Sequence, residues 1–497
     1  MIIKNGLVFD LENGFVSRDL FTDGSLIAEA SGDSTVVDAG DCYVIPGLVD
    51  VHFHGAVGED FSDATREGLQ RIADFELSEG VTYITPTSMT LSEETLMEIC
   101  TNVAAHRAES TSGAEVVGAH LEGPFLSYAK RGAQNADFLR DPDAEMLARL
   151  QEASKGCVKL ITMAPEQPNG IDFVKKAGEL GVTVSVGHTT ADYETAMAAF
   201  AAGAMQATHL YNGMPPIHHR EPAVIGAAFD SPGVRAELIC DGIHIHPAIV
   251  RLTFRRFGAD RMILISDSLR AAGMPDGRYP FGGQEIEVHG NRATIADHPE
   301  TLAGSVTSLM GCMKQAISMG IPMADAVRAA SYNPACAIGI DDRMHTLYVL
   351  AAESHDAAGS TTADIIAHLN GFFGGIRERY GYVDRVRADC ADPVMINTEA
   401  LNTEWRVCGS VKNAISDRIR ATAYLMEHHR LKIVRGACDD LVEAFCNAVW
   451  DPKKHDDERL DNFTYNVCIL DAFEYAFEEY INALIPDLAR EEINEYE

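Results

Sequence analysis

The sequence is poor in basic residues. Its 497 residues include 40 lysines and arginines against 74 aspartates and glutamates, which gives a formal net charge of −34. Such an excess of negative charge opposes loose binding to the phosphate backbone of nucleic acids. Nucleic acid is therefore not expected as a partner, although one local basic pocket can still bind a single phosphate group.

The sequence also lacks several targeting and cysteine patterns. Its 11 cysteines include no C-x-x-C pair, and the N-terminus, MIIKNGLVFD, lacks the basic and then apolar pattern of a signal peptide. No window of 18 residues is uniformly apolar, so no transmembrane helix is expected. These absences predict a cytoplasmic protein with reduced thiols and no membrane association.

The length and the changes in pattern along the chain predict more than one domain. Residues 1–43 alternate short apolar runs with turn residues, which predicts a small antiparallel β unit. Residues 44–340 alternate strand and helix patterns. Residues 341–497 combine long amphipathic helical patterns with one strand-like run, Thr346–Ala352, and are expected to form a mostly helical α/β segment.

The middle part is of the α/β class, and its pattern favours a TIM (β/α)8 barrel over a doubly wound sheet. Its strand-like segments are 44–52, 81–86, 115–121, 158–163, 182–186, 204–208, 235–240 and 261–266. Helical patterns lie between and after them, at 65–79, 92–109, 141–155, 190–202, 246–258, 304–319 and 322–331. Residues 276–300 are rich in turns and alternate in polarity, which predicts a β-hairpin insertion.

The first barrel strand ends in the stretch PGLVDVHFHG, residues 46–55. It carries His52 and His54 two positions apart. Side chains at i and i+2 point to the same face of a strand, so both imidazoles can reach one metal ion. The end of a buried parallel strand is where α/β enzymes place their chemistry.

Polar residues lie at the C-terminal ends of five further strands of the expected barrel. Each has a structural alternative: a histidine can be a satisfied core residue, Asp267 can cap the next helix, and Glu122 can be an ion-pair partner. Together they favour one functional site at the C-terminal end of the barrel. These strand-end residues are Glu122, His188, His209 with Asn212, His244, and Asp267.

Four imidazoles and two carboxylates are a donor set that suits zinc, or another borderline divalent metal such as iron or manganese. They are sufficient for one or two ions. An aspartate beside a metal-activated water can take its proton and pass it to a leaving group, while the metal polarises a carbonyl. The sequence therefore predicts a metal-dependent hydrolase that cleaves a C–N bond.

Over residues 1 to about 339, the chain resembles the N-acetylglucosamine-6-phosphate deacetylases of the amidohydrolase superfamily. The resemblance rests on several stretches in family order: PGLVDVHFHG, GAHLEGPFLSYAKRGAQN, VGHTTADY, ATHLYNGMPPIHHREPAVIG, ICDGIHIHP, LISDSLRAAGMPDGRYPFGG and TLAGS. It implies hydrolysis of the N-acetyl group to give glucosamine 6-phosphate and acetate, in cytosolic amino-sugar catabolism.

The resemblance also assigns metal ligands and catalytic groups. It implies that Glu122, His188 and His209 hold one metal, and that His52 and His54 supply a second site that only some members possess. Asp267 is then the catalytic acid and base. The resemblance further implies that His244 contacts the substrate and helps to polarise the acetyl carbonyl. Gln134 stands where some members have a histidine that touches the sugar.

The same resemblance implies how the phosphate is bound. The contacts carry over to Arg220 and to the backbone around Asn212 and Gly213, and an arginine fork explains how so acidic a protein can bind an anion. In the family this arginine can come from the neighbouring subunit, so a homodimer is expected. Family members commonly have alanine in place of Gly213, a change expected to have no effect.

The C-terminal part departs from this family. After AIGIDDR the closing segment that completes the N-terminal β unit is missing, which leaves Thr346–Ala352 as the candidate to replace it. From about residue 343 the chain resembles the nuclease part of phage terminase large subunits, with Asp389 and Asp471 as candidate ligands of hard cations. An acidic helical segment also has many solvated aspartates, so these two can equally have no function.

Two alternative functions remain open from the sequence. One is an amidohydrolase acting on a cyclic amide, although such enzymes usually bridge two metals with a lysine at the end of the fourth strand, where this chain has TMAPE. The other is a DNA-packaging nuclease whose function resides in the C-terminal segment.

Overall fold

A computed structural model describes residues 1–23, 26–28, 35–110 and 112–340, with residues 347–349, 386–388, 407–409, 422 and 431–433 farther along. The chain divides into two compact units, Met1–Asp341 and Asp342–Glu497. Asp389 and Asp471 lie outside the described residues, as do nearly all of the helices expected after residue 341. Within the part of the chain that the structure describes, no helix combines the length and apolarity needed to cross a membrane.

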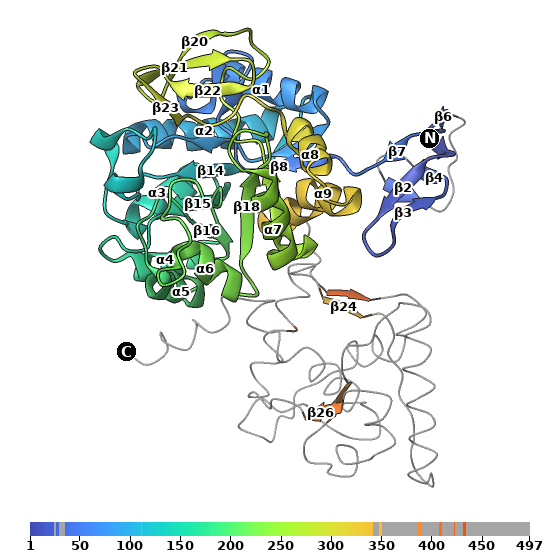
Figure 1. The fold of residues 1–497 in the computed structure, drawn as a ribbon. Coiled ribbons are helices and arrows are strands. Elements are labelled where there is room, and N and C mark those ends of the chain that lie inside the picture. The colour runs from blue at the N-terminus through green and yellow to red at the C-terminus, as the bar shows by residue number, and fades with distance from the viewer. Residues whose placement is uncertain are drawn as a thin grey trace, which may run out of the picture. The chain divides into compact units, whose positions relative to one another are not determined.

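The first unit contains a TIM-like barrel of parallel strands (Figure 1). The eight strand positions are occupied by β8 (Leu48–Asp50), β11 (Val81–Ile84) with β12 (Thr87–Ser88), β13 (Glu115–Val116) with β14 (Ala119–Glu122), β15 (Val158–Met163), β16 (Thr183–Val186), β17 (Gln206–Ala207), β18 (Arg235–Ile239) and β19 (Met262–Ile265). The strands pair in the order β12-β14-β15-β16-β17-β18-β19 and β13-β11-β8.

Backbone bonds just beyond the last and first strands close the barrel. The amide of Asp267 donates to the carbonyl of His52 over 3.0 Å, and the amide of His54 donates to the carbonyl of Ser268 over 2.7 Å. Strand positions eight and one therefore lie side by side where they carry polar residues. All eight expected strands are confirmed, with one shift: Tyr43–Val44 pairs with the N-terminal unit and not with the barrel.

Helices surround the strands (Figure 1). They are α1 (Arg66–Ser78), α2 (Glu93–Glu109), α3 (Ala144–Ala153), α4 (Gly170–Glu179), α5 (Tyr193–Ala201), α6 (Ala223–Asp230), α7 (Pro247–Phe257), α8 (Leu309–Ser318), α9 (Met323–Ala330) and α10 (Tyr332–Ala337). Several start at a side-chain cap, as at Thr65, Ser92 and Asp143, where a side-chain oxygen accepts an otherwise unpaired backbone N–H. The helix pattern of the sequence predicted seven of them within a few residues.

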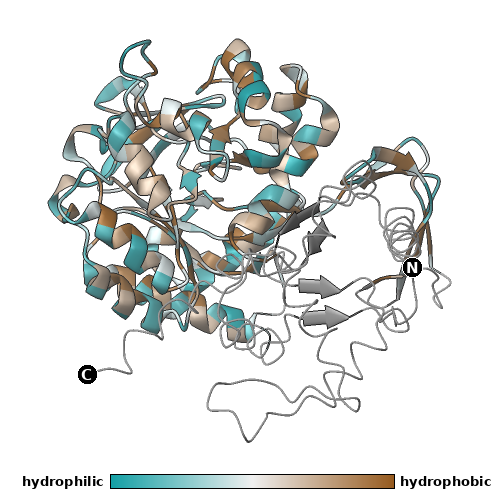
Figure 2. Ribbon diagram, turned by 90° about the horizontal axis from the view of Figure 1, so that it is seen from below, coloured by the Kyte–Doolittle hydropathy of each residue, from teal (hydrophilic) through white to brown (hydrophobic). Residues whose placement is uncertain are grey.

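The core lies between the helices and the barrel strands. Strand β19 is wholly buried, and Leu48, Ile84 and Leu121 on neighbouring strands are also fully inaccessible. Figure 2 shows hydrophobic residues along the strands and more polar residues over the outer helices. This burial fixes the barrel, so the residues at the strand ends are held on a rigid support.

The N-terminal unit consists of two small sheets. One has the order β5-β4-β1-β6 and the other β3-β2-β7, formed by β1 (Ile2–Lys4), β2 (Leu7–Asp10), β3 (Gly14–Ser17), β4 (Leu20–Asp23), β5 (Leu26–Ala28), β6 (Val36–Asp38) and β7 (Tyr43–Val44). The expectation of an antiparallel unit was wrong in part, because β1 pairs in parallel with β6 and β2 with β7. The chain between them crosses over instead of making a hairpin.

One edge of the larger N-terminal sheet is exposed. Strand β6 pairs only with β1 among the described strands, and Val36 on it is 53% exposed. The expected replacement for the missing closing strand does not pair there. Residues Leu347–Val349 (β24) instead pair in parallel with Leu431–Ile433 (β27), within the second unit. The second unit also pairs Val386–Ala388 (β25) with Val407–Gly409 (β26).

The insertion after the eighth barrel strand is larger than the expected hairpin. It is a four-stranded antiparallel sheet of β20 (Gly277–Phe281), β21 (Gln284–His289), β22 (Arg292–Ile295) and β23 (His298–Leu302). The turns at 290–291 and 296–297 return the chain twice more, which the hairpin prediction did not include. Phe281, Ile286 and Val288 form a small core together with Met89, which follows β12.

Candidate metal centre and active site

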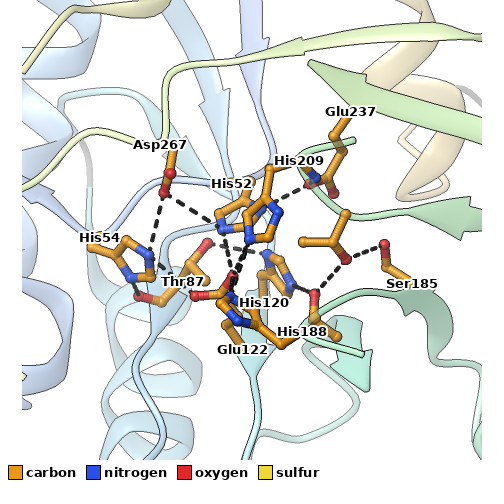
Figure 3. Close-up of polar contacts among 12 residues, drawn as sticks. His52, His54, Thr87, His120, Glu122, Ser185, His188, His209, Glu237 and Asp267 are labelled. Carbon is orange, nitrogen blue, oxygen red and sulfur yellow. Dashed lines mark hydrogen bonds and ion pairs between the residues drawn. The ribbon is translucent and has the colours of Figure 1, made fainter. Parts of the chain in front are cut away.

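Glu122 lies at the centre of a cluster of histidines at the C-terminal ends of the barrel strands (Figure 3). Its Oε1 atom is 3.1 Å from Nε2 of His188, 3.1 Å from Nε2 of His209 and 3.3 Å from Nε2 of His52. Its Oε2 atom is 3.4 Å from Nε2 of His54. All five side chains are buried, so the structure brings together the five metal ligands expected from the sequence.

These residues form two overlapping groups with the composition of metal sites. His52, His54 and Glu122 make one group, and Glu122, His188 and His209 make the other; within each group the ligand atoms lie within 4.8 Å of one another. Glu122 is common to both. The arrangement can hold one cation in each group, with the carboxylate between them.

The outer nitrogen of each ring is held by an acceptor. Nδ1 of His54 lies 3.1 Å from the carbonyl oxygen of Thr87, Nδ1 of His188 lies 2.7 Å from that of Lys130, and Nδ1 of His209 lies 3.1 Å from that of Asn212. A carbonyl oxygen can only accept, so each Nδ1 carries the hydrogen. Each Nε2 lone pair then points toward Glu122, as a metal ligand requires.

The cluster has the geometry of a cation site. Nε2 of His188 and Nε2 of His209 face each other across 3.1 Å, and both face a carboxylate oxygen. Nε2 of His52 is buried and has no hydrogen-bond partner. Atoms that carry lone pairs converge here, and only a proton or a cation between them relieves their repulsion. The donor set therefore fits a divalent metal ion.

The pKa values of the cluster also favour a positive charge among these side chains, because those of His52 and His54 are raised and that of Glu122 is lowered. Burial alone would lower the pKa of His52, but the carboxylates of Glu237 and Glu122 outweigh it and raise the pKa well above its usual value. For His54, burial is outweighed by hydrogen bonds to Asp267 and Glu122, which raise its pKa to about 9. Burial would raise the pKa of Glu122, yet the charges of His188 and His52 hold it well below its usual range.

Asp267 faces this cluster from the end of β19. Its Oδ1 atom is 3.4 Å from Nε2 of His54 and 3.8 Å from Nε2 of His52. Burial would raise the pKa of Asp267, but a hydrogen bond from His54 and the charge of His52 outweigh burial and lower it. The carboxylate is thus ionised at neutral pH and can accept a proton.

Three of the strand-end residues have left-handed backbone conformations. The φ angles of His188, His209 and Asp267 are 46°, 26° and 49°. Residues other than glycine rarely adopt positive φ, and such conformations gather at functional sites where the surrounding fold enforces them. The sharp bend at each position turns the side chain into the cluster.

A cavity of about 390 Å³ opens onto the cluster. Barrel residues line one side, including His244, Tyr211 and Asn212, and residues of the insertion line another, including Phe281 and Thr301–Gly304. Nδ1 of His244 is 2.7 Å from Oδ2 of Asp241. Burial would lower the pKa of His244, but the hydrogen bond to Asp241 and its charge outweigh burial and raise it. His244 can therefore donate a proton or a hydrogen bond into the cavity.

Of the residues expected to bind the substrate, Gln134 lies at the cavity and Arg220 does not. Gln134 lines the cavity, but its Nε2 donates to Oε2 of Glu122 over 2.6 Å and its Oε1 accepts from the amide of Thr90 over 2.6 Å. Its amide is thus engaged with a ligand of the metal cluster. Arg220 does not line this cavity; it lies in an exposed loop, with Nη1 2.6 Å from Nε2 of His219.

Gly213 is confined by the metal cluster. Its φ is +62°, and a Cβ atom built there would lie 3.1 Å from Nδ1 of His188 and 3.3 Å from Cε1 of His209. These distances are shorter than ordinary contacts, so an alanine at this position needs small shifts of the rings. That this exchange has no effect on function stays a prediction.

Sequence reasoning missed three residues that support the site. Glu237 contacts His52, Asp241 contacts His244, and the ring of His120 packs 4.6 Å from that of His52, between Thr87 and Thr162. A signal existed for Glu237, since it is the one acidic residue inside the apolar strand Arg235–Ile239. His120 and Asp241 stand within motifs that were noted for their neighbours.

Comparison with known proteins agrees with this geometry. The model of the amidohydrolase family matches residues 43–348, and the chain belongs to that family. It is 37% identical over 313 residues to N-acetylglucosamine-6-phosphate deacetylase of Bacillus subtilis, covering 62% of this chain and 78% of the relative. It is 33% identical over 303 residues to N-acetylgalactosamine-6-phosphate deacetylase of Escherichia coli O157:H7, covering 61% and 80%.

A solved structure is also similar. The crystal structure of N-acetyl-D-glucosamine-6-phosphate deacetylase from Mycobacterium smegmatis is 32% identical, with a TM-score of 0.63, and the match covers 68% of this chain and 91% of that one. Metal dependence is a property of the family, and the His/Glu groups of this chain fit it.

Proposed function

We propose that this protein is a metal-dependent N-acetylglucosamine-6-phosphate deacetylase, which releases acetate and glucosamine 6-phosphate in cytoplasmic amino-sugar catabolism. The observation that carries this proposal is the carboxylate of Glu122, within 3.4 Å of four imidazole nitrogens and close to Asp267, in an amidohydrolase barrel. Deacetylases from several organisms, including Bacillus subtilis and Vibrio furnissii, support the substrate.

Glu122, His188 and His209 would hold one divalent ion, and His52 and His54 would hold the second with Glu122. A divalent ion there supplies Lewis acidity, which lowers the pKa of a water molecule and polarises the carbonyl under attack. Zinc, iron and manganese all suit a set of imidazole and carboxylate donors. The residues of the chain perform the other steps.

Asp267 would carry the proton. As the water oxygen adds to the carbonyl carbon of the acetyl group, Asp267 takes the proton that the water releases. The C–N bond then breaks, and Asp267 returns this proton to the amine nitrogen. Its lowered pKa suits the first step, because the group must be ionised when water attacks.

His244 would orient the acetyl group. Its Nδ1 is fixed by Asp241, so its Nε2 is the atom left to face the substrate. A hydrogen bond from it to the acetyl oxygen would strengthen as negative charge develops there. Gln134 would act through Glu122, by holding one carboxylate oxygen in place, and not through the sugar.

The function is tested by measuring acetate released from N-acetylglucosamine 6-phosphate by purified full-length protein, before and after chelation and after divalent metal is restored. Metal-dependent release is expected. The relative that acts on N-acetylgalactosamine 6-phosphate makes the galactose epimer the appropriate second substrate. Release from neither sugar by metal-loaded protein would reject the proposal, and faster release from the second would change the substrate to the galactose epimer.

Arg220 is proposed to bind the phosphate of a substrate held by the neighbouring subunit of a homodimer. It lies outside the cavity of its own chain, exposed in the loop before α6, so it is available to a second subunit. Together with Asn212 and Gly213, which line the cavity, it would select the phosphorylated sugar through charge-assisted hydrogen bonds.

Arg220→Ala is expected to lower kcat/KM for N-acetylglucosamine 6-phosphate by about 10- to 1,000-fold, because a fork to phosphate contributes a few kcal/mol. Activity on the unphosphorylated sugar should change little. The matched control is Arg149→Ala, which removes an exposed arginine on α3 that pairs with Glu93 on α2. Equal losses on both sugars would show that Arg220 supports the structure and not the phosphate.

The second unit is proposed to be dispensable for deacetylation and inactive as a nuclease. Every residue assigned to the reaction lies in Met1–Asp341, which is compact by itself. A chain ending at Asp341 is expected to release acetate at a rate within about threefold of the full-length rate, since the barrel sites are complete. The β6 edge is exposed in the full-length chain as well, because β24 pairs with β27 and not with β6, so both proteins are expected to share its tendency to aggregate.

The measurements are acetate release, solubility, and nicking of plasmid DNA in magnesium or manganese by the full-length protein. Nicking that disappears on Asp389→Asn would contradict this account and make the protein bifunctional. Loss of acetate release by a folded, soluble truncation would show that the second unit contributes to catalysis.

A further inference from the structure

Glu237 is a buried carboxylate that the proposed mechanism does not use. It lies in β18, where its neighbours Ala236 and Leu238 are apolar and fully buried, and Glu237 itself is 0% exposed. Its Oε2 atom lies 2.8 Å from Nδ1 of His52 and accepts the backbone N–H of His209 over 3.0 Å. Its Oε1 atom accepts from Nε2 of Gln206. An ionised group is retained in an apolar strand only where such partners compensate its desolvation.

His52 differs from the other three histidines in what holds its outer nitrogen. Nδ1 of His54, His188 and His209 faces a neutral backbone carbonyl, whereas Nδ1 of His52 faces a carboxylate (Figure 3). A charged acceptor forms a stronger hydrogen bond and makes the opposite nitrogen a better electron donor. Of the described histidines in the cluster, His52 is therefore the one whose ligand strength is set by a second side chain.

We propose that Glu237 is a positioning residue that sets the affinity of the His52–His54–Glu122 group for its metal ion. It does so by fixing the tautomer and ring orientation of His52 with its Nε2 toward Glu122. The inference rests on the proposed function as a metal-dependent hydrolase and extends it to the occupancy of the second ion. Glu237 touches no reacting atom, so its effect on turnover follows from the metal that His52 binds.

The same oxygen of Glu237 also contacts the other metal group, through the backbone of His209 and not through its ring. A neutral oxygen at that place can still accept this N–H, although the hydrogen bond is weaker than one to a carboxylate. The ring of His209 keeps its own acceptor, the carbonyl of Asn212. Removing the charge of Glu237 should therefore weaken the His52 group and leave the Glu122–His188–His209 group nearly unchanged.

Glu237→Gln is suited to this test because the surroundings can accept an amide. Oε1 of Gln206 is buried and has no hydrogen-bond partner. If Gln206 turns its amide over, this oxygen accepts from the new amide of residue 237, whose own oxygen still faces His52 and His209. The variant then keeps the shape and the contacts of residue 237 and removes its charge, while Nε2 of Gln206 takes the unpaired place that its Oε1 held.

Full-length protein is first stripped of metal with a chelator and then titrated with Zn²⁺ in the presence of a competing chelator, which reports the affinity of each step. The number of bound zinc ions is counted by mass spectrometry. Two binding steps are expected for the wild type, and His52→Ala identifies the step that belongs to the His52 group. Glu237→Gln should weaken that step about 10- to 100-fold, as expected for the loss of a partner that orients a ligand, with the other step within about threefold.

Two further variants separate positioning from general damage. Glu76→Gln alters a buried carboxyl on α1 whose Oε2 atom has no hydrogen-bond partner and whose pKa is raised by burial and by the charge of Asp50. This variant should bind both ions as the wild type does. Glu237→Ala, which removes the acceptor altogether, should weaken the His52 step further. With Co²⁺ in place of zinc, Glu237→Gln should change the visible absorption of the His52 site alone.

A single binding step in the wild type, or equal weakening of both steps in Glu237→Gln, would overturn the assignment, as would unchanged affinity at the His52 step. Acetate release is measured separately on the wild type. A protein that binds two ions with the expected response to Glu237→Gln but releases no acetate would reject the proposed function and keep the assignment of Glu237.

Discussion

Glu122→Gln is expected to abolish acetate release, by more than about 10⁴-fold, which corresponds to about 5 kcal/mol of activation barrier. Glu122 is the one residue common to both groups of ligands. The amide has the same shape but lacks the charge that offsets two cations, so bound metal should fall to trace levels. The checks are acetate release and the metal content of the purified variant.

His52→Gln provides the graded comparison. It removes a ligand from one group and leaves Glu122, His188 and His209 in place, and three such ligands can still hold a metal with an open position. Its loss of turnover should be smaller than that of Glu122→Gln. A fully active wild type with no bound metal would be incompatible with the whole assignment, and full activity in Glu122→Gln would remove Glu122 from it.

Asp267→Asn is expected to lower kcat for N-acetylglucosamine 6-phosphate by about 100- to 10,000-fold, the usual contribution of a general acid and base. The amide cannot take a proton from water at neutral pH. Because Glu122 and the four imidazoles remain, the variant should retain its bound metal. The pair of measurements, turnover and metal content, distinguishes loss of the base from loss of the site.

Asp172→Asn, an exposed carboxylate on α4 that pairs with Lys175, is the control for a general effect of removing a charge. It should behave as the wild type does. Near-normal turnover in Asp267→Asn at neutral pH would show that another group moves the proton. Loss of metal together with turnover would instead make Asp267 a ligand.

The sequence predicts the barrel well because its signal is local. Alternation of buried strands with amphipathic helices is visible without any contact information, and strand ends then place His52, Glu122 and Asp267 at one end of the barrel. Even the two-residue strand β17 was found, from the apolar stretch that leads to His209. The ligand cluster can therefore be predicted from the barrel topology and from the histidines and carboxylates at the strand ends.

The errors concern pairings and contacts between distant segments. The parallel pairing of β1 with β6 depends on a crossover that looks locally like a turn-rich hairpin unit. The partners of Gln134 and Glu237 are chosen by packing, since Glu237 reaches a histidine 185 positions earlier in the chain. Such contacts have no spacing in the sequence to reveal them, although a lone acidic residue in an apolar strand indicates that one exists.

The four-stranded insertion has a consequence for how this enzyme can diversify. It packs in a small core that it shares with Met89, and its two ends meet beside Asp267. The amide of Ser305 donates to the carbonyl of Asp267, and the amide of Leu269 donates to the carbonyl of Ser305. The segment between them supplies one wall of the cavity but no metal ligand. Changes in Thr301–Gly304 would therefore alter the shape of the space that the sugar enters while every metal ligand stays in place.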